Sequence, residues 1–239
     1  MTDWHAARWS AQASILPAAY HPSGAATGGL GGTGLVADDL YLLAHDDRTG
    51  RASLGPRALG IGLAGALLAD LMLGGSISIG RDGSVTAHRS WPGDDLGRRV
   101  RDQIAAEPDP RPLRDWLLFV ARGAAVEVAS RLERAGYLEH VRSWVPGRPA
   151  RWVPIDANLA FSPNLRVSSA LDPSRPFDPR AAALTGLAAA CGLGFRIAQS
   201  QKPAGRSVDE SVGQLLPQLR HLIAQTQAAV DSAVLSHRT

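Results

Sequence analysis

The sequence predicts a mainly α-helical fold: a central helical bundle with peripheral helices and two β-hairpins. Several long segments place apolar residues at helical spacing, and glycine or proline marks their ends. Two short segments alternate apolar and polar residues around a turn signal, Asp82-Gly83 in one and Pro146-Gly147 in the other. Hydrophobic residues make up 45% of the 239 residues and charged residues 20%, which is ordinary for a globular protein.

Residues 1–34 are predicted to form a flexible tail, and residues 35–239 a single helical domain. The run HPSGAATGGLGGTG, from His21 to Gly34, has the glycine-rich composition of a flexible linker. The spacing of Gly29, Gly31 and Gly34 matches the dinucleotide-binding fingerprint, which requires a strand immediately before it. Proline and serine precede these glycines instead. We therefore assign them to the linker.

The most informative segment is a nearly uncharged stretch, residues 54–73, whose length would suffice for a membrane span. Arg57 and Asp70 interrupt it, and its glycines and proline lower its apolarity. We therefore predict a buried core helix. Pro56 suits the first turn of that helix, and Gly74-Gly75 ends it.

The remaining elements are predicted from local signals of the same kind. They are a short helix over 40–46 capped by Asp38 or Asp39, a hairpin over 76–88, a helix over 96–106 capped by Asp94-Asp95, a helix over 113–135 ended by Gly136, a hairpin over 137–155, a proline-punctuated connection over 156–179, and two helices over 178–200 and 207–236. Pro217 is expected to kink or restart the last helix.

Catalytic motifs are missing from the sequence. It contains no HExxH, CxxC, GxSxG or P-loop pattern, and its seven histidines are scattered without metal-ligand spacing. We therefore predict a protein that is not an enzyme and needs neither a cofactor nor a metal. The single cysteine, Cys191, is predicted to be a small buried side chain. A single cysteine cannot form an internal disulfide, and the N-terminus lacks the pattern of a secretory signal. Both observations favour a cytoplasmic setting.

Two kinds of binding are open from the residues alone. A helix followed by a hairpin is the pattern of winged-helix DNA-binding domains, in which Arg142, Arg148 and Arg151 would touch phosphate. Trp144 and Trp152 beside arginines also suit a membrane interface. A third, plainer interpretation is a hairpin that packs its tryptophans on the core or on a partner. The formal net charge of +3 is too modest to indicate a dedicated nucleic-acid binder.

The order of several segments resembles the Golgi phosphoprotein 3 family, and we place the chain with its bacterial, GPP34-type members. The matching segments are LYLLAHDDRTGR, LAGALLADLMLGGSISI, DWLLFV, RLERAGYL, DPRAAALTGLAAACGL and VGQLLPQLRHLIAQTQAAV, in this order. They cover about residues 36–235. The resemblance implies a mostly helical fold and a peripheral membrane protein that binds phosphatidylinositol 4-phosphate. In eukaryotic members it also implies adaptor work that retains glycosyltransferases in the Golgi.

The resemblance also implies where a lipid headgroup would bind. Eukaryotic members use a loop tryptophan and arginines on two helices. The tryptophan position falls on Gly55 here, and the arginine positions fall on Ala64, Arg122 and Ala125. Arg51 and Arg57 lie in the corresponding loop and could substitute for the unmatched groups.

We therefore predict a cytoplasmic, peripherally membrane-associated protein whose partner is an anionic, phosphoinositide-like phospholipid. Arg51, Arg57 and Arg122 would bind the headgroup. The hairpin between Val141 and Ile155 would contact the membrane or mediate self-association through its tryptophan and arginine side chains (Trp144, Arg148, Arg151 and Trp152). The alternatives are a protein-interaction module without lipid binding and, third, winged-helix-like DNA binding.

Overall fold

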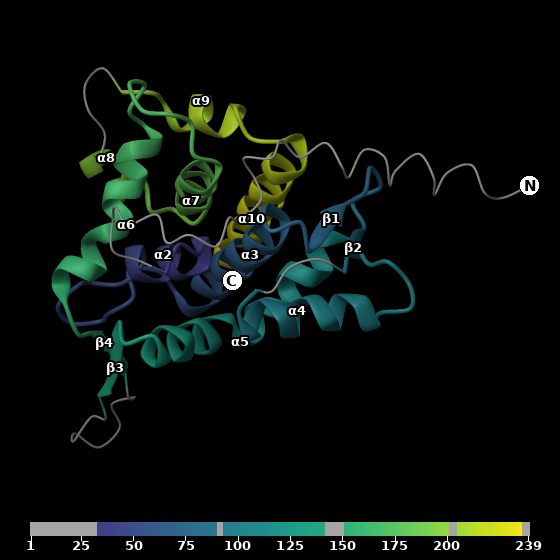
Figure 1. The fold of residues 1–239 in the computed structure, drawn as a ribbon, viewed down its shortest axis with the longest axis horizontal. Helices are drawn as coiled ribbons and strands as arrows, with labels where there is room; N and C mark the ends of the chain where they lie inside the picture. The colour runs from purple at the N-terminus through teal and green to yellow at the C-terminus, as the bar shows by residue number, and fades with distance from the viewer. Residues whose placement is uncertain (1–32, 90–92, 142–150, 201–204, 236–239) are drawn as a thin grey trace, which may run out of the picture.

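The computed structural model describes residues 33–89, 93–141, 151–200 and 205–235, and α3 lies at the centre of the helices (Figure 1). The helices of the described part are α2 (Val36–Leu43), α3 (Pro56–Leu73), α4 (Asp95–Ala106), α5 (Leu113–Arg134), α6 (Ala157–Ala170), α7 (Pro179–Ala190), α8 (Gly194–Ser200), α9 (Val208–Gly213) and α10 (Pro217–Leu235). The strands are β1 (Ile77–Ile79), β2 (Val85–Ala87), β3 (Leu138–Val141) and β4 (Arg151–Pro154). These elements confirm the predicted mainly helical fold with two hairpins.

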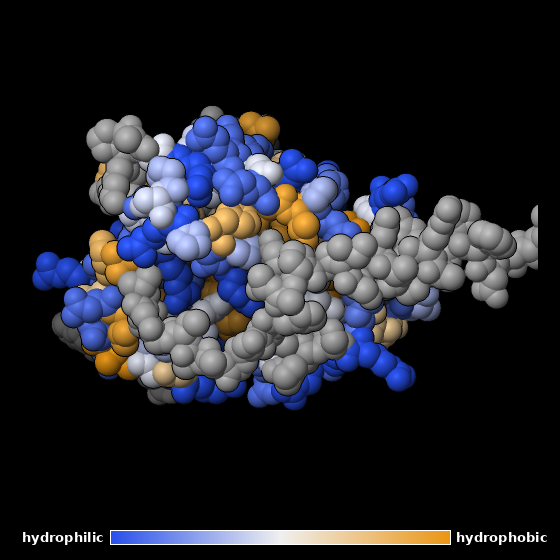
Figure 2. Space-filling view, turned by 45° about the horizontal axis from the view of Figure 1, so that its top comes forward, coloured by the Kyte–Doolittle hydropathy of each residue, from blue (hydrophilic) through white to orange (hydrophobic). Residues whose placement is uncertain are grey.

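Helix α3 is the core helix that the sequence predicts. It begins with Pro56 in its first turn and ends before Gly74, and all its residues from Ala58 to Leu73 are buried. It contacts α2, α5, α7 and α10. Its length and composition alone would allow it to cross a membrane, but 89% of the relevant window is buried inside the protein. On the face shown in Figure 2, apolar residues appear as small areas among hydrophilic ones.

The glycines of α3 allow its neighbours to approach closely. A Cβ atom placed on Gly60 would lie 2.6 Å from the backbone oxygen of Ala121 in α5. A Cβ on Gly65 would lie 2.6 Å from the hydroxyl of Thr226 in α10. Small residues therefore set the distance between α3 and the two long helices packed on it.

Helix α2 begins earlier than predicted. Asp38 and Asp39 were expected to cap a helix over 40–46, but the N-cap is Leu35 and both aspartates lie inside the first turn. Their carboxylates pair with arginines from α5 and α6 instead. The cap is supplied from α3: the Asp70 carboxylate accepts hydrogen bonds from the backbone N–H groups of Val36 and Ala37 at 2.9 and 3.1 Å.

The two hairpins are antiparallel pairs. In the first, Ile77 pairs with Ala87 and Ile79 with Val85, and Gly83 adopts a φ of 79° in the turn. In the second, β3 and β4 pair from Leu138↔Pro154 to Val141↔Arg151. The predicted Pro-Gly turn lies outside the described residues, as do Arg142, Trp144 and Arg148.

The predicted connection over 156–179 is wrong, because residues 157–170 form α6. Asp156 caps it by accepting a hydrogen bond from the N–H of Asn158 at 2.8 Å. Pro163 lies inside the helix and is buried. The prolines of this region predict breaks in a helix. Tertiary burial of the helix outweighs the hydrogen bond that one internal proline removes.

The C-terminal helices are each divided. The helix predicted over 178–200 is α7 followed by α8, with Gly192 at a φ of 84° between them. The helix predicted over 207–236 is α9 followed by α10. Pro217 begins α10, so the expected restart at this proline is confirmed. Ser207 and Glu210 form a capping box at the start of α9.

Candidate functional site

Arg57 and Arg122 lie on two helices that touch. Arg57 is one turn before Gly60 in α3, and Arg122 directly follows Ala121 in α5. Gly60 and Ala121 form the close backbone approach between these helices. Both arginines belong to exposed positions. Each of these two predicted cations therefore lies within three residues, along its own helix, of the same backbone approach.

The start of α3 can itself attract an anion. An α-helix carries partial positive charge at its N-terminus, where backbone N–H groups lack helical partners. Gly55 is the N-cap residue and offers no side chain, and the first turn of this 18-residue helix contains no acidic residue. Arg57 adds a formal positive charge at the same end. The charge distribution at this helix end thus favours a phosphate or carboxylate.

Arg51 lies at a second contact, beside the β3–β4 hairpin. The preceding Gly50 has a φ of 64°, and a Cβ there would collide with the backbone oxygen of Trp152 in β4. Only glycine fits this position, so the turn before Arg51 packs directly on β4. Arg51 and Arg151 are exposed on either side of that contact. Convergence of Arg51, Arg57 and Arg122 on one ligand stays a prediction.

Trp152 is held against the protein. Its side chain is half-buried and packs on the core, and its indole N–H donates to the Glu133 carboxylate at 3.1 Å. The His140 ring lies 4.9 Å from it, centroid to centroid. These contacts favour the interpretation in which this tryptophan packs on the core. Membrane contact through the remainder of the hairpin stays a prediction.

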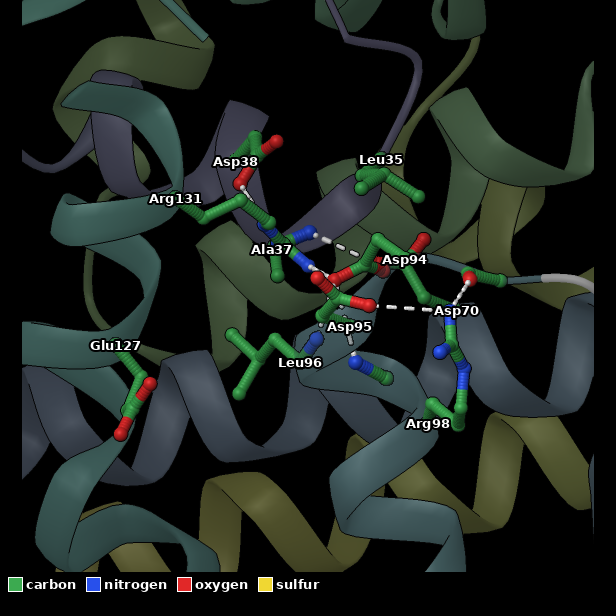
Figure 3. A network of polar contacts seen from close by, with 12 residues as sticks. Leu35, Ala37, Asp38, Asp70, Asp94, Asp95, Leu96, Arg98, Glu127 and Arg131 are labelled. Carbon is green, nitrogen blue, oxygen red and sulfur yellow. Dashed lines mark hydrogen bonds and ion pairs between the residues drawn. The ribbon is translucent and has the colours of Figure 1, made fainter. Parts of the chain in front are cut away.

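A network of carboxylates and arginines joins the first turn of α2 to five other helices. Figure 3 shows the part of it around Arg131, Asp38 and Asp94. Arg131 of α5 is its centre. Its guanidinium donates to Asp38 at 2.6 and 2.9 Å and to Asp94, the N-cap residue of α4, at 2.9 Å. Arg166 of α6 pairs with Asp39. In α7, Arg180 donates to Asp70 at 3.2 Å.

Burial dominates the electrostatics of this network. Loss of solvation raises the pKa of Asp39 to about 7 and that of Asp70 to about 6, although arginines oppose the shift. Burial likewise raises the pKa of Asp38 against the charge of Arg131. Burial also opposes ionisation of Asp94, yet the Arg131 charge and the N–H groups at the start of α4 lower its pKa.

This network is suited to holding helices together rather than to binding a ligand. The side chains of Asp38, Asp39, Asp70 and Arg131 are each less than 10% exposed, and their charges face one another. Within the described ranges, no group of histidine, cysteine, aspartate and glutamate side chains could hold a metal ion. The network fixes α2 and α5, and with them the loop that carries Arg51 and the helix that carries Arg122.

Cys191 is buried, as predicted. Its side chain lies against Gly62 of α3, and burial raises the pKa of its thiol to about 12. A protonated, inaccessible thiol is a poor nucleophile. Cys191 therefore belongs to the packing of the core.

Sequence reasoning missed two features. The first is the ion network: an aspartate such as Asp70, inside an otherwise uncharged helix, signals that a buried partner exists, but not which one. The second is the exposed side of α5. Leu118, Phe119 and Val126 are 40%, 45% and 58% exposed, and they lie outside the helical spacing of the buried apolar residues of α5. A helix that is apolar on several sides carries the signal for such a surface.

The fold and these sites together define a helical-bundle protein with an internal ion network and with exposed arginines on two helices that pack together. The sequence profile of the Golgi phosphoprotein 3 (GPP34) family matches residues 36–235. The chain therefore belongs to the Golgi phosphoprotein 3 family. A search among curated proteins finds no match to the chain.

Proposed function

We propose that this protein is a non-enzymatic, peripheral membrane protein that binds acidic phospholipid headgroups, of the phosphatidylinositol 4-phosphate type. Membership of the Golgi phosphoprotein 3 family supports a lipid-binding role. The observation that supports the proposal is that exposed Arg57 and exposed Arg122 each lie within three residues of the close backbone approach between Gly60 of α3 and Ala121 of α5. Arg122 is also the arginine that matches a lipid-binding position of eukaryotic family members.

The proposed chemistry combines two kinds of donor. The start of α3 offers a partial positive charge, and the guanidinium groups offer charge-assisted hydrogen bonds, which are stronger than neutral ones. Arg51 lies in the loop before α3 and would add a third guanidinium group. A monoester phosphate on an inositol ring carries more charge than a phosphodiester alone, so such a site prefers a phosphorylated headgroup. The protein would act at the cytoplasmic face of a membrane.

Sedimentation with vesicles tests this proposal. Phosphatidylcholine vesicles with and without phosphatidylinositol 4-phosphate are compared for the full chain and for Arg57→Ala, Arg122→Ala and Arg175→Ala. The control residue Arg175 is exposed in the loop between α6 and α7. Each site arginine is expected to contribute about 1 kcal/mol, so its loss weakens binding about fivefold, whereas Arg175→Ala binds like the wild type. Added salt should weaken binding further.

Two results would contradict the proposal. One is equal recovery of the wild type with neutral and with acidic vesicles. The other is unchanged binding after Arg122→Ala. In that case light scattering, before and after replacement of Trp144 and Trp152, tests the alternative of a self-associating interaction module. A gel shift on random duplex DNA at low salt tests winged-helix binding, because phosphate affinity appears there first.

A further inference from the structure

Helix α5 presents an apolar stripe to solvent on the side away from the core. Leu118, Phe119 and Val126 project there, and Arg122 lies between them. Residues 118, 119, 122 and 126 are spaced by three or four, so they follow one face of the helix. The opposite face of α5 is buried through Leu117, Ala124, Val128 and Leu132. We call the exposed set the α5 stripe.

The α5 stripe is built rigidly. The Phe119 ring meets the ring of buried Trp116 edge to face, with 5.7 Å between centroids, so its direction is fixed from below. Glu127 beside the stripe pairs with Arg99 of α4 at 2.6 Å, which offsets its negative charge. Asp115 is exposed one turn before the stripe begins. The stripe thus presents large apolar groups around one cation.

The position of the stripe links it to the proposed headgroup site. Arg122 belongs both to the stripe and to the proposed headgroup site. The preceding residue, Ala121, contacts Gly60 near the start of α3. In a bilayer, the acyl chains begin just below the headgroup phosphates. An apolar side chain next to an arginine that binds a headgroup would therefore lie at the depth of the first acyl carbons. Cations meet headgroups and aromatic or aliphatic groups enter the layer below.

A lipid surface suits the stripe better than a second protein chain. A stable protein interface buries about 800 Å² on each partner, whereas the stripe offers the exposed parts of three apolar side chains. A membrane needs no such area, since a few inserted side chains and a few cations act together with a bound headgroup. The central Arg122 also complements an anionic lipid.

We propose that Leu118, Phe119 and Val126 enter the interfacial layer of an anionic bilayer while Arg122 engages the headgroup above them. The α5 stripe, rather than the hairpin alone, is then the surface that rests on the membrane. This inference rests on the proposed lipid-binding function.

The test separates headgroup recognition from insertion. Binding of the soluble headgroup glycerophosphoinositol 4-phosphate is measured by calorimetry. Binding to phosphatidylcholine vesicles that contain phosphatidylinositol 4-phosphate is measured by sedimentation. The variant is Leu118→Ser with Phe119→Ser. The matched control is Phe161→Ser with Leu165→Ser on α6, where the side chains are 51% and 44% exposed. Circular dichroism verifies that both variants fold.

The α5 variant should bind the soluble headgroup like the wild type but bind vesicles on the order of tenfold more weakly, since two half-exposed apolar side chains no longer leave water. The α6 control should match the wild type in both assays. A second readout is a polarity-sensitive dye on Phe119→Cys. Native Cys191 is buried and will not compete for the dye. The dye emission should shift to the blue on acidic vesicles.

The possible outcomes distinguish failure of the stripe inference from failure of the proposed function. Normal headgroup binding with undiminished vesicle binding by the α5 variant, or no emission shift at position 119, overturns the stripe inference and leaves the proposed function standing. If the wild type binds neither the soluble headgroup nor the acidic vesicles, the proposed function fails and takes the inference with it. Equal losses in the α5 and α6 variants also overturn the inference, because they would reflect general surface apolarity.

Discussion

The close contact between α3 and α5 predicts that replacing Gly60 by alanine destabilises the protein. Replacement by alanine would place a methyl carbon 2.6 Å from the backbone oxygen of Ala121. A Cβ atom essentially never lies that close to another heavy atom, and the obstructing atom here is backbone rather than the end of a flexible side chain. The two helices must therefore move apart, or α3 must rotate.

The magnitude follows from two opposing effects. Overpacking a well-filled helix contact costs about 1 to 3 kcal/mol. Alanine in place of glycine in a helix interior returns about 1 kcal/mol, because alanine has the higher helix propensity. We expect Gly60→Ala to lower the free energy of unfolding by up to about 2 kcal/mol, which corresponds to a melting temperature lower by up to about 8 °C for a chain of this size.

Gly123 provides the matched control within α5. It is exposed, and a Cβ there would lie 3.9 Å from Cγ of Glu127, an ordinary contact. Gly123→Ala should therefore stabilise the protein by about 0.5 to 1 kcal/mol through helix propensity alone. Urea unfolding followed by circular dichroism measures both variants against the wild type. The reasoning about the α3–α5 contact is wrong if Gly60→Ala proves as stable as Gly123→Ala.

Two further predictions concern the ion network. Arg131→Met leaves the Asp38 carboxylate buried without its partner and should cost about 3 to 5 kcal/mol in urea unfolding, part of which the added Asp38→Asn change should restore. Stability should also depend on pH. The pKa values of Asp39 and Asp70, raised to about 7 and about 6, mean that the folded state holds protons which unfolded carboxylates release near 3.8. The contribution of these groups is fully present below that value and is lost as pH rises through their folded pKa values, so Asp39→Asn should flatten the fall in stability from about pH 4 to about pH 7.

Each of these predictions has a result that would contradict it. For Arg131, the contrary result is a double variant no more stable than Arg131→Met alone. For the pH dependence, Asp231→Asn is the control, because Asp231 is exposed on α10 and should leave the pH profile unchanged. A profile that keeps its full slope in Asp39→Asn would mean that Arg166 keeps Asp39 ionised throughout.

For the predicted binding residues, the sequence indicates which residues are candidates but not how they are arranged. Arg51, Arg57 and Arg122 can be found from the sequence, through the resemblance of its segments to the Golgi phosphoprotein 3 family. Their arrangement cannot, since it depends on which glycine faces which backbone oxygen across two helices. The apolar partners of Arg122 in the α5 stripe were also hidden, because exposure of Phe119 is decided by what packs beside α5.

The sequence by itself determined the elements whose signals are local. Pro56 and Gly74 delimit α3, Asp94 caps α4, Gly83 turns the first hairpin and Pro217 begins α10. Each signal acts through backbone geometry within a few residues, so no distant part of the chain is needed to interpret it.

Only the tertiary structure decided the start of α2, the existence of α6 and the role of the acidic pair. Asp38 and Asp39 look like helix caps until arginines 93 and 127 residues away in the chain reach them. Once buried, a carboxylate must find a partner or a proton, and a distant guanidinium satisfies that need more strongly than a local N–H group. Long-range burial thus overrode the local preference at these positions.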